Sequence, residues 1–167
     1  MAINDDVTKK IISDVKICFE NIGLSIAAEE EGENQLSLYS EIEDDFYTMR
    51  LKVTFCPIVE IIVLYICFLT TAPPEAREVL CELANLINKL MLTDYVTICS
   101  DTGAIMFHTS MLLAESSLDK DQFDFVLGRL LTNSLVHFRL LCSQVYSELS
   151  PQENLERFME ENKDLYS

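Results

Sequence analysis

Residues 58–69 form a long apolar run, reading IVEIIVLYICFL, with Glu60 as its one charged side chain. Its β-branched and aromatic residues favour a strand, and a strand that is apolar on both faces must be covered on both faces. Leaving five such side chains in water would forfeit about 10 kcal/mol, at about 1.5–3 kcal/mol each, which rivals the stability of a whole domain. The central question is therefore what lies on each side of this strand.

Glu60 suggests which face of this strand is turned outward. Side chains alternate along a strand, and an unpaired carboxylate is costly to bury. We therefore expect the residues on the Glu60 side to bind a partner or a second copy of the chain; they are Ile62, Leu64, Ile66 and Phe68. The opposite side is expected to face the core, through Val59, Ile61, Val63 and Tyr65. A slip of one residue would exchange the two faces.

Length and charge restrict the class of protein. A chain of 167 residues fits one domain, and we assign residues 1–150 to a single α+β domain and 151–167 to an acidic tail with a short amphipathic helix. A net charge of -16 opposes binding to nucleic acid or to an anionic membrane. The apolar run is also too short to span a membrane, which needs about 20 residues. Basic or amphipathic polypeptides are the favoured partners, although an acidic surface also serves solubility alone.

The cysteines and the N-terminus indicate a reducing compartment. The 6 cysteines form no Cys-x-x-Cys pair, and most lie in apolar runs, where free thiols behave as small hydrophobic side chains. The first residues are acidic and lack the pattern of a signal peptide. We expect a cytoplasmic protein with reduced cysteines.

Hydrophobic periodicity predicts the order helix, three strands, helix, two strands, long helix. The first helix covers residues 8–22, and an acidic loop over 27–45 contains one short edge strand at 36–42. Strands follow at 47–55 and 58–69, a helix opens at the Pro-Pro pair of 73–74, and a hairpin joins 95–99 to 104–113 through Gly103. Asp119 is the predicted N-cap of the long helix, with Gln122 as its capping-box partner. This order predicts an α+β fold, an antiparallel five-stranded sheet with helices mainly on one face.

The stretch 35–146 resembles the YbjN family, which shares the fold of the type III secretion chaperones, the Tir chaperone-like fold. The resemblance rests on the meander 47–69, the Ala-Pro-Pro opening with the helix core LANLIN at 83–88, the hairpin around Asp101-Thr102-Gly103, and LDKDQF at 118–123. It implies a small, acidic, usually dimeric protein that binds unfolded or extended polypeptide and has no catalytic residues. The acidic segment before the sheet and the tail after Ser150 lie outside the pattern.

Residues that could carry chemistry are few. His108 lies in a strand, where a lone histidine is usually structural. His137 and Cys142 are five positions apart on the long helix, about 140° around its axis, so they do not form a dyad. No Cys or His cluster has the spacing of a metal site, and with 4 glycines no phosphate-binding loop can be written. We expect no cofactor, no metal and no catalytic residue.

Three functions remain, in order of preference. The first is a non-enzymatic, chaperone-like or regulatory homodimer that captures an extended or amphipathic polypeptide with a sheet edge and an exposed apolar face. The second is an acidic scaffold or regulator that docks a basic protein. The third is an enzyme with a site in a cleft near His108.

Overall fold

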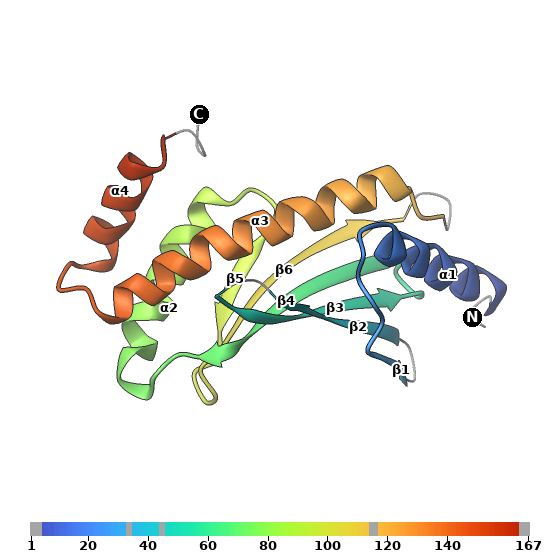
Figure 1. Cartoon of the computed structure of the whole chain (residues 1–167), viewed down its shortest axis with the longest axis horizontal. Helices are drawn as coiled ribbons and strands as arrows, with labels where there is room; N and C mark the ends of the chain where they lie inside the picture. The colour runs from blue at the N-terminus through green and yellow to red at the C-terminus, as the bar shows by residue number, and fades with distance from the viewer. Residues whose placement is uncertain (1–4, 33–34, 44–45, 114–116, 164–167) are drawn as a thin grey trace.

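A computed structural model describes residues 5–32, 35–43, 46–113 and 117–163, and it folds them into a six-stranded antiparallel sheet and four α-helices (Figure 1). The elements are α1 (Asp5–Asn21), β1 (Ala28–Gly32), β2 (Gln35–Glu43), β3 (Thr48–Cys56), β4 (Ile61–Thr71), the short 3-10 helix η1 (Pro74–Ala76), α2 (Arg77–Leu90), β5 (Tyr95–Ile98), β6 (Ala104–Leu112), α3 (Lys120–Val145) and α4 (Pro151–Glu161). The strands lie in the order β1-β2-β3-β4-β6-β5. The predicted α+β class and antiparallel sheet are confirmed.

The prediction of five strands is wrong, because β1 is a sixth. Its sequence, AEEEG, has low strand propensity and no apolar alternation, and it was predicted to be part of an acidic loop. The backbone ladder to β2 forms it all the same, with Glu30 opposite Ser37. As a result β2 is an inner strand of the sheet, not the predicted edge strand. Glu33, Asp44 and Asp45, which belonged to the same predicted loop, lie outside the described residues.

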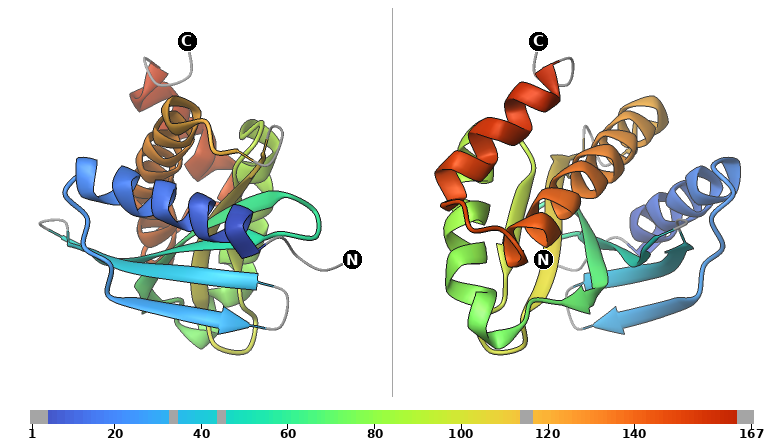
Figure 2. Two further views of the ribbon diagram at one scale, coloured as in Figure 1. Left: turned by 90° about the vertical axis from the view of Figure 1, so that its right-hand side faces the viewer. Right: turned by 60° about the vertical axis from the view of Figure 1, so that its left-hand side comes forward.

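None of the four described helices covers the second face of the sheet. Figures 1 and 2 show α1 and α3 lying over the same side of the sheet, with α2 and α4 stacked at the end that holds β5. Burial along β4 follows this arrangement, because Ile62, Leu64, Ile66 and Phe68 are buried while the residues between them stay partly exposed. We call the helix-covered side the core face and the other side the open face.

The core is one cluster that joins the sheet to every helix. Its centre is aromatic: the Phe68 ring stacks on the Phe138 ring of α3 with centroids 3.6 Å apart, and Phe107 of β6 meets Phe68 edge-on at 6.0 Å. By length and composition α3 could cross a membrane, a test that the core helix of a soluble protein also passes. In this structure ten residues along α3 are buried, among them Phe123, Leu130 and Leu141.

Two local predictions hold for the backbone, although the predicted capping box of Asp119 and Gln122 is only half formed in α3. The Asp119 carboxylate accepts a hydrogen bond from the backbone N–H of Gln122 at 3.0 Å and so caps α3. In the β5–β6 hairpin Gly103 has φ +75° and its N–H bonds to the Cys99 carbonyl at 2.7 Å. These are the positions where the sequence specified the backbone most directly.

The segment after Ser150 forms a capped helix that packs on the body of the protein. Ser150 and Glu153 form a complete capping box at the start of α4. Leu155 is buried, and the Asn154 side chain donates to the Gln144 side chain of α3 at 2.8 Å. Helix α4 is therefore bound to α3 by a buried amide pair as well as by apolar contact.

Candidate functional site

The open face is organised by a row of five side chains that crosses most of the sheet. Tyr39 is opposite Lys52, Lys52 is opposite Tyr65, and Tyr65 is opposite His108, which is also opposite Tyr95. Because partners in register point to the same side of a sheet, all five lie on the open face. We call this set the central row.

Side chains of the central row contact one another in two groups, one at each end of the row. The His108 ring lies 5.9 Å from the Tyr65 ring and stacks on the Tyr95 ring at 5.7 Å. At the other end the Lys52 ammonium lies 5.3 Å from the centre of the Tyr39 ring, whose hydroxyl donates to Glu30 at 2.5 Å. Burial among these neighbours lowers the pKa of His108, so the ring is neutral at pH 7 and acts as part of an aromatic surface.

The open face is apolar on one half and charged on the other. Strands β4, β6 and β5 contribute half-buried Val63, Cys67 and Met106 and the more exposed Leu112 and Tyr95. Leu112, with 71% of its surface exposed, marks one end of this half.

Strands β2 and β3 make up the charged half. There Arg50 forms an ion pair with Glu41 at 3.1 Å, which accompanies the contact between Lys52 and Tyr39. Arg50, Glu41 and Lys52 thus already have partners within the chain, whereas the apolar half presents side chains that water solvates poorly.

The predicted orientation of the central strand is wrong. The residues expected to face a partner, Ile62, Leu64, Ile66 and Phe68, lie on the core face and are at most 2% exposed. The cause is Glu60, because the prediction counts it as a residue of the strand. Residues 57–60 form a turn, Glu60 has φ 52°, and β4 begins only at Ile61, so the alternation of the strand does not extend to it. The partly exposed side of β4 is the one carrying Val63 and Tyr65.

The thiols do not support the enzyme hypothesis near His108. Cys67 lies on the open face one row from His108, and burial raises its pKa, which is opposite to what a nucleophilic thiol needs. Burial also raises the pKa of Cys18, to about 11. Hydrogen bonds from Thr102 lower the pKa of Cys99, which lies alone in the hairpin turn. All six cysteines are free, and the part of the chain that the structure describes has no group of three potential metal ligands.

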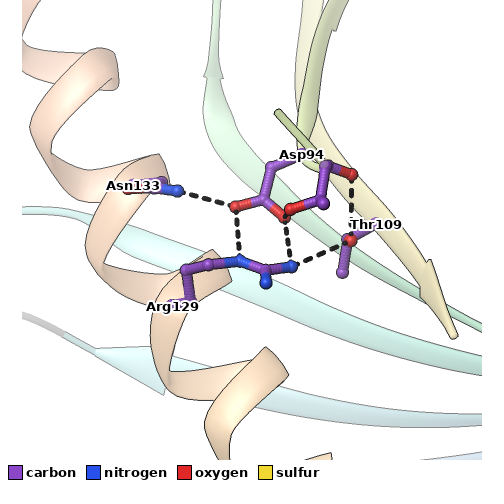
Figure 3. A network of polar contacts seen from close by, with 5 residues as sticks. Asp94, Thr109, Arg129 and Asn133 are labelled. Carbon is purple, nitrogen blue, oxygen red and sulfur yellow. Dashed lines mark hydrogen bonds and ion pairs between the residues drawn. The ribbon is translucent and has the colours of Figure 1, made fainter. Parts of the chain in front are cut away.

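A buried polar cluster, which the sequence patterns do not predict, lies on the core side and connects α3 to the start of β5 (Figure 3). The Asp94 carboxylate is almost fully buried and accepts from Arg129 at 2.9 and 3.3 Å and from Asn133 at 2.7 Å. Arg129 also donates to Thr109 at 3.4 Å, and Thr109 donates to the Thr93 carbonyl at 3.1 Å. A possible signal was the pair Arg129 and Asn133, which places two polar side chains one turn apart on a largely apolar helix. Both carboxylate oxygens accept hydrogen bonds from the protein, so the cluster has a structural role and holds α3 against the start of β5.

Comparison with protein-family models gives a match over residues 24–143, to the family YbjN, described as "Putative bacterial sensory transduction regulator". The chain belongs to the YbjN family. The match begins before β1 and ends within α3, so it includes the whole sheet and the open face. The resemblance predicted from residues 35–146 is thereby confirmed at the level of the family.

Two solved structures share the fold of this YbjN-family chain. One is titled "Crystal structure of YbjN, a putative transcription regulator from E. coli", with a TM-score of 0.51, 14% identity and coverage of 73% of this chain and 84% of that chain. The other is an uncharacterized protein from Methanothermobacter thermautotrophicus, with a TM-score of 0.56, 11% identity and coverage of 79% and 96%. No curated protein matches the sequence. The family description is that of a regulator, while the type III secretion chaperone-like fold stays a prediction.

Proposed function

We propose that this YbjN-family protein is a non-enzymatic regulator that works by binding a polypeptide on the open face of its sheet. The observation that carries the proposal is the alternation along β4. One set of its residues is buried by the protein's own helices, whereas Val63, Tyr65 and Cys67 between them stay partly exposed beside Met106 and Leu112. Tyrosine rings together with aliphatic side chains are typical of the centre of protein-binding surfaces.

Charge identifies the kind of polypeptide. The chain carries 28 acidic and 12 basic residues, so its field attracts basic segments and repels acidic ones. On the open face itself, the rings of Tyr65 and Tyr95 offer π-surfaces to lysine or arginine side chains. We therefore propose an amphipathic segment of another protein, with apolar residues against β4 and β6 and basic residues at its border.

We further propose that the protein is a homodimer and that it is located in the cytoplasm, as the sequence predicts. A dimer would double the number of open faces and let one extended client engage two of them, which raises apparent affinity. The sedimentation coefficient of the purified protein tests the dimer directly, because a species of 19.1 kDa would reject it.

A matched pair of leucine variants tests the open face. Leu112→Ser changes an exposed leucine on the open face, and Leu92→Ser changes a 93% exposed leucine in the loop before β5. The probe is a fluorescein-labelled amphipathic peptide of alternating leucine and lysine, titrated by fluorescence anisotropy. Loss of one buried leucine contact corresponds to about 1.5 kcal/mol, or roughly tenfold in Kd.

We expect this tenfold weakening for Leu112→Ser and an unchanged Kd for Leu92→Ser. Equal affinity of both variants and the wild type would reject the open face as the binding surface. Binding that disappears in high salt for all three proteins alike would instead favour the acidic scaffold, since contacts between exposed charges are screened.

A further inference from the structure

The two edges of the sheet differ in whether they can accept another strand. At the β5 edge the Asn88 side chain of α2 donates to the Val96 carbonyl at 2.9 Å and accepts from the Val96 N–H at 2.8 Å. Val96 belongs to a strand of four residues, so this one amide occupies outward-pointing backbone groups near its middle. The β5 edge is thus closed by an asparagine that imitates a neighbouring strand.

The β1 edge has no such cover among the described residues. Strand β1 is the last in the sheet order, and all five of its residues are exposed. Two of its side chains contact other parts of the chain. The Tyr39 hydroxyl donates to Glu30, and Lys16 of α1 pairs with Glu29. A terminal strand presents backbone N–H and C=O groups along its outer side, and these groups can pair with an added strand.

The charge of β1 restricts what can be added. Glu29, Glu30 and Glu31 are consecutive, with Glu29 and Glu31 on one face of the strand and Glu30 on the other. Pairing with β1 of a second copy would bring glutamates of both copies together, and like charges opposite one another are destabilising. A strand with lysine or arginine at alternate positions would instead form cross-strand pairs with Glu29 and Glu31.

We infer that β1 is the docking edge for an extended basic segment of another polypeptide, which adds to the sheet as a further antiparallel or parallel strand. The inference rests on the proposed function in that the bound molecule is a polypeptide, and it adds the edge, the extended conformation and the basic character. Backbone pairing with β1 would supply affinity, and the glutamates would supply selection against acidic segments.

The test uses a labelled peptide of alternating lysine and valine and its counterpart with glutamate in place of lysine. Both are titrated against the full chain, against Glu31→Lys on β1 and against the control Glu156→Lys on the exposed side of α4. Amide hydrogen exchange of the complex locates the bound peptide. We expect the basic peptide to bind the wild type, to lose about fivefold to tenfold in affinity with Glu31→Lys and to be unaffected by Glu156→Lys. Exchange should slow at β1 and stay unchanged at β5.

Other outcomes overturn the inference in recognisable ways. Equal effects of the two charge reversals would mean that only net charge matters. Slower exchange confined to β4 and β6, with sensitivity to Leu112→Ser, would place the peptide on the open face, so the edge would be wrong and the proposed function would stand. Self-association that changes with Glu31→Lys would make the occupant a second copy. Slower exchange at β1 without any effect of Leu112→Ser on the amphipathic probe would reject the open face and keep the edge.

Discussion

At the scale of single residues, the ion pairs of this protein differ in how deeply their carboxylates are buried. Asp94 is 1% exposed and bonded on both oxygens, whereas Glu41 and Arg50 form their ion pair in water. A buried carboxylate that loses its cation keeps the full cost of desolvation, while an exposed pair loses little when it is broken. The two arginines therefore give a matched comparison.

We expect Arg129→Met to lower the free energy of unfolding by about 2–4 kcal/mol, because it leaves the Asp94 carboxylate buried without its guanidinium. Arg50→Met removes an exposed pair and should cost at most about 1 kcal/mol. Urea denaturation at neutral pH measures both. Similar losses for the two variants would show that the Asp94 cluster is more hydrated than its burial indicates.

His137 makes the stability of the core depend on pH. Burial lowers the pKa of His137 below its ordinary value of 6.5, and its Nδ1 lies 2.8 Å from the Asn133 carbonyl oxygen. The unfolded chain therefore takes up a proton at a higher pH than the folded chain does. Stability is at its full value above pH 6.5 and falls as the pH drops from 6.5 towards the folded pKa.

His137→Gln should remove this contribution. The stability advantage of the wild type over His137→Gln is expected to be larger at pH 7.5 than at pH 5, as measured from urea midpoints at both values. His108 remains in both proteins, so its own lowered pKa cancels in the comparison. A difference that is constant with pH would mean that His137 has the same pKa in the folded and unfolded chains.

At the scale of elements, the β5–β6 hairpin is fixed to the end of β4 by its turn. The Gly103 carbonyl accepts from the Ala72 N–H at 2.8 Å, and Arg77 donates to the Ser100 and Asp101 carbonyls at 2.8 and 2.7 Å. A Cβ on Gly103 would lie 2.4 Å from the Ala72 carbonyl oxygen, which is closer than atoms can approach. The turn therefore requires glycine for its backbone conformation and for its close contact.

Two glycines separate these requirements. Gly103 has φ +75° and a crowded site, while Gly23, after α1, has φ +77° with nothing near the added Cβ. Gly23→Ala should lower the free energy of unfolding by about 1–2 kcal/mol, because alanine is strained in the left-handed conformation. Gly103→Ala should lower it by roughly 1–3 kcal/mol more, because the added Cβ must also displace the backbone at Ala72. Thermal unfolding monitored by circular dichroism compares them, and an equal loss would show that the Ala72 segment moves aside freely.

At the scale of the whole molecule, α4 behaves as part of the folded body. Leu155 is buried, and the Gln144–Asn154 pair joins α4 to α3. Leu155→Ala should therefore lower the global free energy of unfolding by about 2–4 kcal/mol. Leu92→Ala, an exposed leucine, should change it by less than about 0.5 kcal/mol. If residues 151–167 were an independent tail, Leu155→Ala would speed amide exchange within α4 and leave the urea midpoint unchanged.

Much of the fold was readable from local patterns. The β3 strand alternates strictly, Asp119 caps α3, and Gly103 closes a hairpin, and each of these depends on neighbours in the sequence. The capping box of Ser150 and Glu153 is equally local, although the Ser150-Pro151 pair predicts only the end of the long helix before it. Strand β1 had no such signal, because its glutamates become a strand only through pairing with β2.

The sequence alone determined that a strand apolar on both faces lies at the centre of an acidic α+β protein, because composition and periodicity are properties of the chain. Tertiary structure decided which face is buried. Glu60 lies in the turn before β4, so its side chain does not share the alternation of the strand, and inferring the outward face from it exchanged the two faces. Likewise, Asp94 meets Arg129, and Asn88 closes one sheet edge while β1 leaves the other open, only because the folded chain brings distant segments together.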